Sequence, residues 1–215
     1  MSKATNREEI AREICSAAKL YKEYLVGKRF LYVFDDRYIE VLYKIANFKH
    51  LTGVECKMSA GEFYKNALKN KLQGSQIYFS NRHPYALCKR KVKHLCDISL
   101  LASSENFVLE EIVTNTRTYK FGTTDTEFSL CMNREYDERG NEKGDCYIVE
   151  SLRDEDCFSK SKNVYTVTHI LAKNNTVPLY TDVLFSEKSS YLKKLPESIL
   201  KLLDRALLDD EKGIL

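Results

Sequence analysis

Six segments of the C-terminal half decide the fold class: FVLEEIVT (107–114), TYKFG (118–122), EFSLCMN (127–133), CYIVESL (146–152), VYTVTHILAK (164–173) and PLYTDVLF (178–185). Apolar residues in them tend to recur at every second position, which is typical of strands because successive side chains point to opposite faces of a sheet. Turn-like stretches such as DERGNEKGD (137–145) separate the segments. We therefore expect residues 107 to 185 to form one sheet of six mostly antiparallel strands.

Helices are expected on the N-terminal side of this sheet. Thr5 followed by Glu8 is a capping-box pattern, and apolar residues then recur at spacings of three and four up to Leu25. Ser59 and Glu62 repeat the capping pattern at the start of SAGEFYKNALKNKL (59–72), which predicts a second helix. The sequence thus predicts helices over residues 5–25 and within residues 59–72.

A third helix, over about residues 84 to 102, is expected to have one apolar and one basic side. Pro84 suits its first turn, and one side carries Leu87, Lys91, Leu95 and Leu101. The run RHPYALCKRKVKH (82–94) contains five Lys or Arg residues and two His residues, with no acidic residue. Such a run suits the phosphates of RNA, although a solvated basic surface is the usual alternative. The RNA-binding candidates in it are Arg82, Lys89, Arg90 and Lys93.

Two further elements complete the expected architecture. RFLYVF (29–34), a charged turn beginning at Asp35, and YIEVLY (38–43) predict an early β-hairpin, with a helix as the alternative for YIEVLYKIA (38–46). Pro196 and ESILKLLDRALL predict a final helix over residues 196–209. The predicted fold class is α+β, with N-terminal helices packed on a C-terminal, mostly antiparallel sheet. Core candidates are Ile10, Ile14, Leu95, Val108, Leu130, Ile148 and Ile170.

Composition places the chain among ordinary globular proteins. With 215 residues, of which 43% are hydrophobic, it can bury a full core as a single domain over residues 1–215, and no Gly/Ser-rich or Pro-rich linker divides it. Seven cysteines without a CxxC pair indicate a reducing compartment. The polar start MSKATNREEI and the lack of a long apolar stretch favour a cytoplasmic protein with no membrane partner. A net charge of +3 does not by itself indicate nucleic acid binding.

Several blocks of the sequence resemble a family of phage and mobile-element nucleases. They are FKHLTG (48–53), the helix in GEFYKNALKNKL (61–72), FGTTDTEFSLCM (121–132), IVESL (148–152) and ILAK (170–173). The chain is similar in them to the fourth of the phage-type barnase/EndoU/colicin/RelE-like nuclease families. This resemblance implies a nuclease-like core over about residues 25–185, with flanking helices at 5–25 and 196–209. It also implies metal-independent cleavage of RNA.

His50 is the leading candidate for proton transfer in such a reaction. Cleavage through the 2′-hydroxyl of RNA needs only a base, an acid and a cation from the protein. Lys49, His50 and Thr52 supply an ammonium group, an imidazole and a hydroxyl in one short segment before Gly53, where the backbone can approach a phosphate. The alternative is a histidine that caps or packs at the end of a strand.

The predicted strands supply further candidates. Ser151 and Arg153 lie at the end of one strand, and His169 and Lys173 share one face of another. We assign RNA-binding roles to Arg153 and Thr52, and catalytic roles to His50, Lys49, Ser151 and Lys173. A solvated sheet face is the competing interpretation, and His169 fits better as a packed side chain.

No cofactor and no metal ion are expected. Cys88, His94 and Cys96 lack the spacing of a paired-cysteine zinc site, and the acidic pairs lie in turns or at exposed edges. The sequence also has no glycine-rich phosphate loop, GxSxG elbow or dinucleotide fingerprint.

Two functions from different classes remain open. The first is a metal-independent ribonuclease of a phage or mobile-element conflict system, a toxin-like enzyme acting on RNA such as tRNA and paired with an antitoxin or another protein partner. The second is a non-catalytic binding or inhibitor module, an anti-defence protein on the same scaffold. The two are distinguished by whether His50 and a strand-borne cation face one open cleft.

Overall fold

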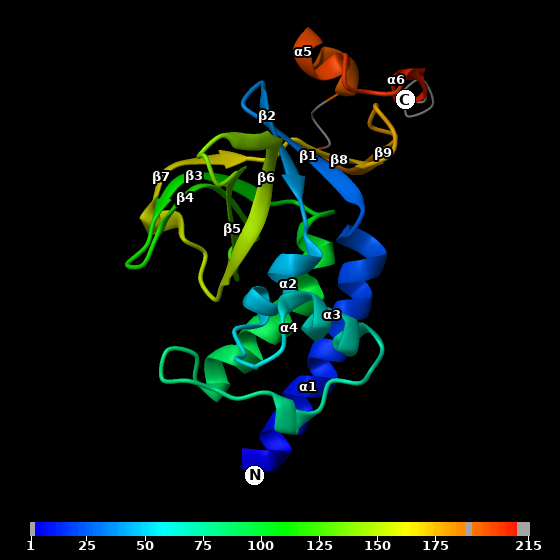
Figure 1. Ribbon diagram of the computed structural model, residues 1–215. Helices are drawn as coiled ribbons and strands as arrows, with labels where there is room; N and C mark the ends of the chain where they lie inside the picture. The colour runs from blue at the N-terminus through cyan, green and yellow to red at the C-terminus, as the bar shows by residue number, and fades with distance from the viewer. Residues whose placement is uncertain (1–2, 188–190, 210–215) are drawn as a thin grey trace.

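Four helices cover one face of a nine-stranded sheet in the computed structural model, which describes residues 3–187 and 191–209 (Figure 1). The helices of this layer are α1 (Lys3–Leu20), which continues as a π-helical turn (Tyr21–Leu25), α2 (Ile45–Thr52), α3 (Ala60–Leu68) and α4 (Tyr85–Leu101). The strands are β1 (Lys28–Phe34), β2 (Arg37–Leu42), β3 (Phe107–Val113), β4 (Thr118–Thr124), β5 (Ser129–Tyr136), β6 (Glu142–Arg153), β7 (Ser161–Thr166), β8 (His169–Asn174) and β9 (Asp182–Ser186).

The strand order is β7-β3-β4-β5-β6-β2-β1-β8-β9, and every neighbouring pair is antiparallel except β2 and β6. The predicted fold class is therefore confirmed. The predicted strand segments after Phe107 lie in one sheet as expected, but they form the seven strands β3 to β9 rather than six, and the early hairpin of β1 and β2 is inserted between β6 and β8. Val41 and Leu42 of β2 pair in parallel with Tyr147 and Ile148 of β6.

The early hairpin forms as predicted, with a two-residue turn at Asp35 and Asp36. Both residues have positive φ angles, 49° and 54°, which suits the twist of the two flanking strands. YIEVLYKIA divides between two elements, because β2 ends at Leu42 and α2 begins at Ile45. The helical alternative for this segment is thus right only for its last residues.

The segment VYTVTHILAK forms two strands, so the prediction of one continuous strand is wrong. β7 ends at Thr166 and pairs with β3, whereas β8 begins at His169 and pairs with β1 and β9. Between them, the Val167 amide donates to the Asn106 carbonyl and the Thr168 amide donates to the Val33 carbonyl. These two hydrogen bonds hold the connection between β7, at one edge of the sheet, and β8, next to the strand at the other edge.

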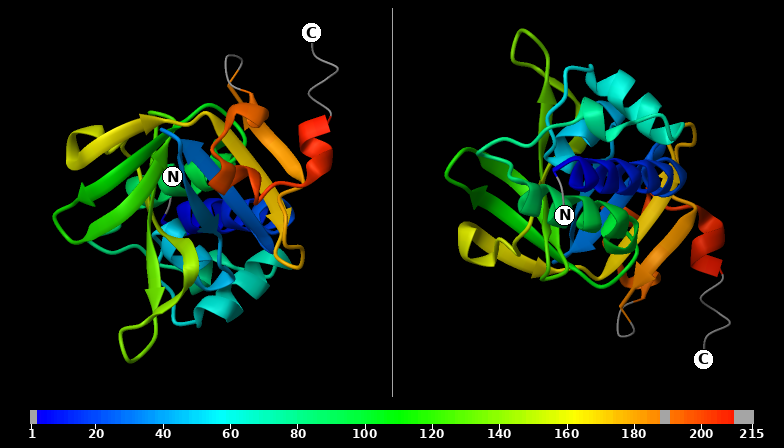
Figure 2. Two further views of the ribbon diagram at one scale, coloured as in Figure 1. Left: turned by 90° about the horizontal axis from the view of Figure 1, so that it is seen from above. Right: turned by 90° about the horizontal axis from the view of Figure 1, so that it is seen from below.

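The predicted helices of the N-terminal half are present. The Ser59 hydroxyl accepts the Glu62 amide at 3.2 Å and caps α3, and α4 follows Pro84. At the first helix the expected cap is wrong, because α1 already begins at Lys3 and includes Thr5. The Glu8 carboxylate instead accepts the Gly74 amide at 2.9 Å. Figure 2 shows from below that α1 and α4 lie side by side.

The predicted C-terminal helix is broken in two. Its described parts are α5 (Glu197–Leu200) and α6 (Arg205–Asp209), preceded by a 3-10 turn (Leu192–Lys194). Between α5 and α6, the Tyr180 amide donates to the Leu202 carbonyl and the Asp204 amide donates to the Tyr180 carbonyl. These bonds form a parallel β-bridge between Tyr180 and Leu203. The backbone must be extended there, so a continuous helix could not form it.

The core occupies both faces of the interior strand β1, which lies between β2 and β8. Phe30, Tyr32 and Phe34 point into the main core beneath the helices, whereas Leu31 and Val33 point into a second cluster with the C-terminal segment. Burial of both faces explains the uninterrupted apolar run RFLYVF. All seven predicted core residues are buried, and all except Ile148 belong to the main core.

Candidate nucleic-acid cleft

Two adjoining cavities lie where α2 and α4 meet the C-terminal end of β6. The larger, of about 860 Å³, and the smaller, of about 360 Å³, share the side chains of His50 and His83. The larger cavity is lined mainly by polar and charged residues, among them Arg82, Arg90, Lys91, Thr116, Tyr119, Ser151, Arg153 and Asp154. We call it the central cleft, and we call the smaller cavity the side chamber.

His50 lies in the last turn of α2, next to the helix end at Gly53. Gly53 has a φ angle of 74°, a left-handed conformation that ends the helix, and its amide donates to the His50 carbonyl. The alternative of a histidine at the end of a strand is therefore wrong, because the block FKHLTG forms the second half of α2 and its C-terminal end. The helix end brings the imidazole to the boundary between the central cleft and the side chamber.

The two histidines have lowered pKa values. The His50 side chain is open to solvent, yet the concave protein surface around it displaces water, and this desolvation is the main cause of its lowered pKa. The Lys91 ammonium group lowers it further. Burial followed by Lys91 also lowers the pKa of His83. Both imidazoles are therefore biased toward the neutral form, in which one ring nitrogen can accept a proton.

Lys91 is a buried cation without a partner. Its side chain is 7% exposed, and it makes no hydrogen bond or ion pair within residues 3–187 and 191–209. A Cβ atom at position 53 would lie 3.2 Å from Lys91 Cδ and 3.6 Å from Nζ, so Gly53 leaves room for the lysine against the end of α2. Burial lowers the pKa of this ammonium group. An unpaired charge in such a place favours an anionic ligand.

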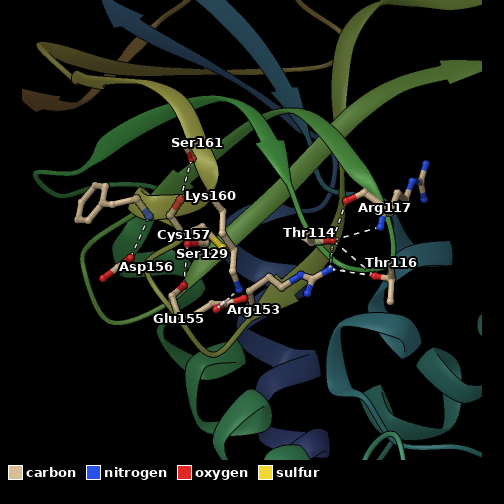
Figure 3. A network of polar contacts seen from close by, with 11 residues as sticks. Thr114, Thr116, Arg117, Ser129, Arg153, Glu155, Asp156, Cys157, Lys160 and Ser161 are labelled. Atoms are coloured by element: carbon tan, nitrogen blue, oxygen red, sulfur yellow. Dashed lines mark hydrogen bonds and ion pairs between the residues drawn. The ribbon is translucent and has the colours of Figure 1, made fainter.

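Arg153 reaches the central cleft from the end of β6. Its Nη2 donates to Thr114 Oγ1 at 3.0 Å and to Thr116 Oγ1 at 3.4 Å, which fixes the guanidinium against the β3–β4 turn (Figure 3). Its Nε is buried and has no hydrogen-bond partner among the described residues. No carboxylate of the described chain forms an ion pair with it, so its positive charge remains available to an anion. Ser151, two residues earlier, lines the same cleft.

Asp154 follows Arg153 and neutralises part of the basic helix. It pairs with the Arg90 guanidinium, and its Oδ1 lies 2.9 Å from His94 Nε2. Burial opposes its charged form, but the hydrogen bonds from Arg90 and His94 outweigh this effect and lower the pKa of the carboxyl group. The His94 ring in turn stacks on Phe128 at 4.7 Å. This group fixes the end of β6 to α4.

Three predicted site residues lie elsewhere or are engaged locally. Lys49 lines the side chamber, where its Nζ donates to the carbonyls of Cys56 at 3.0 Å and Met58 at 2.7 Å. The buried Thr52 hydroxyl donates to the Lys49 carbonyl at 2.7 Å and accepts the Val54 amide. Lys173 lines neither cavity, and its Nζ donates to the Pro178 carbonyl and lies 4.5 Å from the Tyr180 ring centre.

The basic run of α4 divides between different surfaces. Lys89 pairs with Glu9 of α1 at 2.7 Å, and Lys89 and Lys93 border a separate, largely apolar cavity. Arg82 and Lys91 face the central cleft. Acidic residues distant in sequence thus compensate Lys89 and Arg90, although the run itself contains none.

Five of the residues that the sequence suggested separately line the central cleft, namely His50, Arg82, Arg90, Ser151 and Arg153. The sequence assigned no individual role to Lys91 or to His83, although both belong to the basic run. The position of Lys91 within an otherwise apolar helix stripe was the available signal. Among the described residues, no group of three or more His, Cys, Asp or Glu side chains is arranged to hold a metal ion.

Imidazoles, an unpaired ammonium group and a guanidinium group therefore line one open cleft. This set can bind a phosphate and move protons beside it. The family model described as phage-Barnase-EndoU-ColicinE5/D-RelE like nuclease 4 matches residues 13–189. Searches of curated proteins and of solved structures gave no significant match. None of the helices in the described part of the chain is long and apolar enough to cross a membrane.

Proposed function

The chain belongs to the phage-Barnase-EndoU-ColicinE5/D-RelE like nuclease 4 family, and from this premise we propose that it is a metal-independent endoribonuclease whose reaction takes place in the central cleft. The observation that carries the proposal is the Lys91 ammonium group, which belongs to a buried residue, makes no hydrogen bond or ion pair within the described chain, and lines the cleft with His50, His83 and Arg153. A phosphodiester is an anion that would pair with this charge, and the imidazoles beside it supply proton transfer.

The proposed reaction is attack of the 2′-oxygen of RNA on the adjacent phosphorus. Neutral His50 accepts the 2′-hydroxyl proton, the bond from phosphorus to the 5′-oxygen breaks, and a 2′,3′-cyclic phosphate remains on one product. His83 donates a proton to the departing 5′-oxygen. A bound phosphate favours the protonated form of an imidazole beside it, which provides this acid although the pKa of free His83 is lowered.

Lys91 and Arg153 stabilise the negative charge that builds up on the phosphorane oxygens. Both are held before substrate arrives, Lys91 by burial against Gly53 and Arg153 by the two threonine hydroxyl groups. Ser151 has no hydrogen bond from its hydroxyl within the described chain and offers a further donor to a phosphate oxygen. Arg82 at the cleft edge extends the positive surface along the RNA backbone.

The cellular role that we propose is cleavage of RNA, including tRNA, in the cytoplasm during conflict between a phage or mobile element and its host. The family description supports this role because it groups phage nucleases with barnase, colicin and RelE types. An enzyme of this kind would be controlled by an antitoxin or another protein partner. The rival hypothesis, a non-catalytic binding module, predicts that RNA or a protein is bound and never cleaved.

Purified protein incubated with total RNA or tRNA in excess EDTA should yield fragments that end in 2′,3′-cyclic phosphates, because the 2′-hydroxyl is the nucleophile. Mass spectrometry of the product ends provides the measurement. Substrates with 2′-deoxyriboses are the control, since they should bind through their phosphates but remain intact. Tight RNA binding without any cleavage would favour the binding module, and products with linear 5′-phosphates would contradict the mechanism.

The pH dependence of cleavage should reflect the lowered pKa of His50. A general base must be neutral, so kcat/KM should fall as the pH drops below the pKa of the free enzyme's imidazole. Burial and Lys91 lower that pKa, and the acidic limb should therefore have an apparent pKa below 6.5. A pH series of kcat/KM on a short oligoribonucleotide measures the limb. An acidic limb centred above 6.5 would be inconsistent with His50 as the base.

A further inference from the structure

We propose that the side chamber is a nucleobase pocket that selects guanine, with Glu55 as the specificity-determining residue. This inference rests on the proposed function, because the base would belong to the RNA whose phosphate lies in the central cleft. His50 and His83 line both spaces. A nucleotide bound at the histidines would therefore have its base beside the chamber opening.

Glu55 and Tyr78 are held together by a short antiparallel bridge. The Glu55 amide donates to the Tyr78 carbonyl at 3.0 Å, and the Tyr78 amide donates to the Glu55 carbonyl at 2.9 Å. Residues directly opposite each other in such a bridge project their side chains to the same face. Both side chains line the side chamber, so the carboxylate and the phenol ring border one space.

Neither side chain has another evident role. The Glu55 carboxylate makes no hydrogen bond or ion pair within the described chain. Its charge partly offsets the lowering of the pKa of His83, which lies at the chamber boundary. Tyr78 is 40% exposed, which is unusual for a large aromatic side chain that contributes to a core. An exposed ring beside a chamber of about 360 Å³ is suited to stacking on a flat base.

The hydrogen-bonding groups of the chamber distinguish guanine from the other bases. An ionised carboxylate is an acceptor with two oxygens, and guanine alone presents two adjacent donors, N1–H and N2–H, on its Watson–Crick edge. Adenine and cytosine place a ring acceptor beside their amino group, and uracil places carbonyls on both sides of N3–H. Each of these three would set an acceptor against the Glu55 carboxylate.

Lys49 adds a second criterion. Its ammonium group has three donors, of which two are used on the Cys56 and Met58 carbonyls, so one remains in the chamber. Guanine O6 is an acceptor, whereas adenine has an amino group at the equivalent position. A pocket with a carboxylate and a spare ammonium donor therefore favours guanine over adenine at both contacts.

The test compares binding and cleavage for wild type, Glu55→Gln and a matched control, Glu62→Gln, which removes an exposed carboxylate outside the chamber. Calorimetry with the 3′-monophosphates of guanosine, adenosine, cytidine and uridine should give a preference for guanosine in the wild type. Glu55→Gln should reduce that preference roughly 10- to 100-fold, as expected for loss of a two-bond contact to a base edge. Glu62→Gln should retain it. Tyr78→Ala should weaken the binding of all four nucleotides because the stacking ring is lost, whereas Tyr78→Phe should leave their binding unchanged.

Cleavage of oligoribonucleotides that differ in one base should show the same ranking. Wild-type protein that cleaves RNA but binds the four nucleotides equally would overturn the guanine pocket and leave the proposed nuclease function standing. Guanosine-selective binding without any cleavage would support the guanine pocket and overturn the proposed nuclease function. A Glu55→Gln variant with equally reduced cleavage at every base and unchanged nucleotide preference would make Glu55 a proton-transfer group and overturn the pocket.

Discussion

Replacing His50 with alanine should lower RNA cleavage by roughly 10²–10⁴-fold, the range typical for loss of a positioned proton-transfer group. The imidazole is open to solvent at the end of α2, and its side chain makes no hydrogen bond within the described residues. Its removal should therefore leave the fold intact. The measurement is the single-turnover cleavage rate of an oligoribonucleotide, together with thermal unfolding of the same preparation.

Two controls separate proton transfer from binding. Affinity for an uncleavable 2′-deoxy substrate should stay close to the wild-type value, because Lys91 and Arg153 still hold the phosphate. Added imidazole should restore part of the rate of His50→Ala, since the small base can enter the space that the side chain leaves. A folded and fully active His50→Ala protein would defeat the assignment. So would a variant that unfolds, because the histidine would then be structural.

The sheet was predictable where local pattern and burial agree. RFLYVF is an apolar run without alternation, and β1 is an interior strand that is buried on both faces. The charged pair Asp35-Asp36 forms the turn that the sequence predicts. The pairing of the strands was harder to predict from the sequence. Nothing in VYTVTHILAK indicates that Thr166 and His169 belong to different strands near opposite edges of the sheet. The division depends on backbone hydrogen bonds from Val167 and Thr168 to Asn106 and Val33, which are distant in sequence.

The site was predictable only in part, because it joins elements that are far apart in the chain. His50 was identified from its local neighbours, yet two of those neighbours have other contacts: Lys49 is bound to backbone carbonyls and Thr52 is buried. Arg153 was identified from its strand end, and its threonine partners come from the β3–β4 turn. Lys91 was the strongest missed signal, since a lysine between Leu87 and Leu95 on an apolar helix stripe must be buried, paired or functional.

The role that we propose for Lys91 can be tested by comparing the activity of a variant with its stability. An ammonium group on a buried side chain opposes folding when it has no hydrogen bond or ion pair, and here desolvation outweighs the attraction of the nearby Asp154 carboxylate. The same desolvation disfavours the charged form of Lys91 and thereby lowers its pKa. Proteins retain such groups where a ligand provides the missing charge. The cleft therefore holds a cation that would be removed if only the stability of the free protein mattered.

Replacing Lys91 with methionine should consequently raise stability and remove activity in one variant. Methionine fills a similar volume without a charge, so the free energy of unfolding should increase by roughly 0.5–2 kcal/mol, as is common when a functional but unfavourable group is removed. Cleavage should fall by about 10²–10³-fold, the typical loss when one preorganised group that stabilises transition-state charge is deleted. Urea unfolding and single-turnover kinetics on the same preparation measure the two effects.

The pKa of His50 provides a third, independent measurement on the same variant. Lys91 lowers that pKa, so Lys91→Met should move it upward, and an NMR titration of the imidazole protons would detect the shift. Lys65→Met, an equivalent change at an exposed lysine of α3, should alter none of the three quantities. A Lys91→Met protein that is less stable than wild type would mean that the ammonium group has a structural partner. One that is more stable but cleaves RNA normally would remove Lys91 from the reaction, and the phosphate would then have to be held by Arg153 and Arg82 alone.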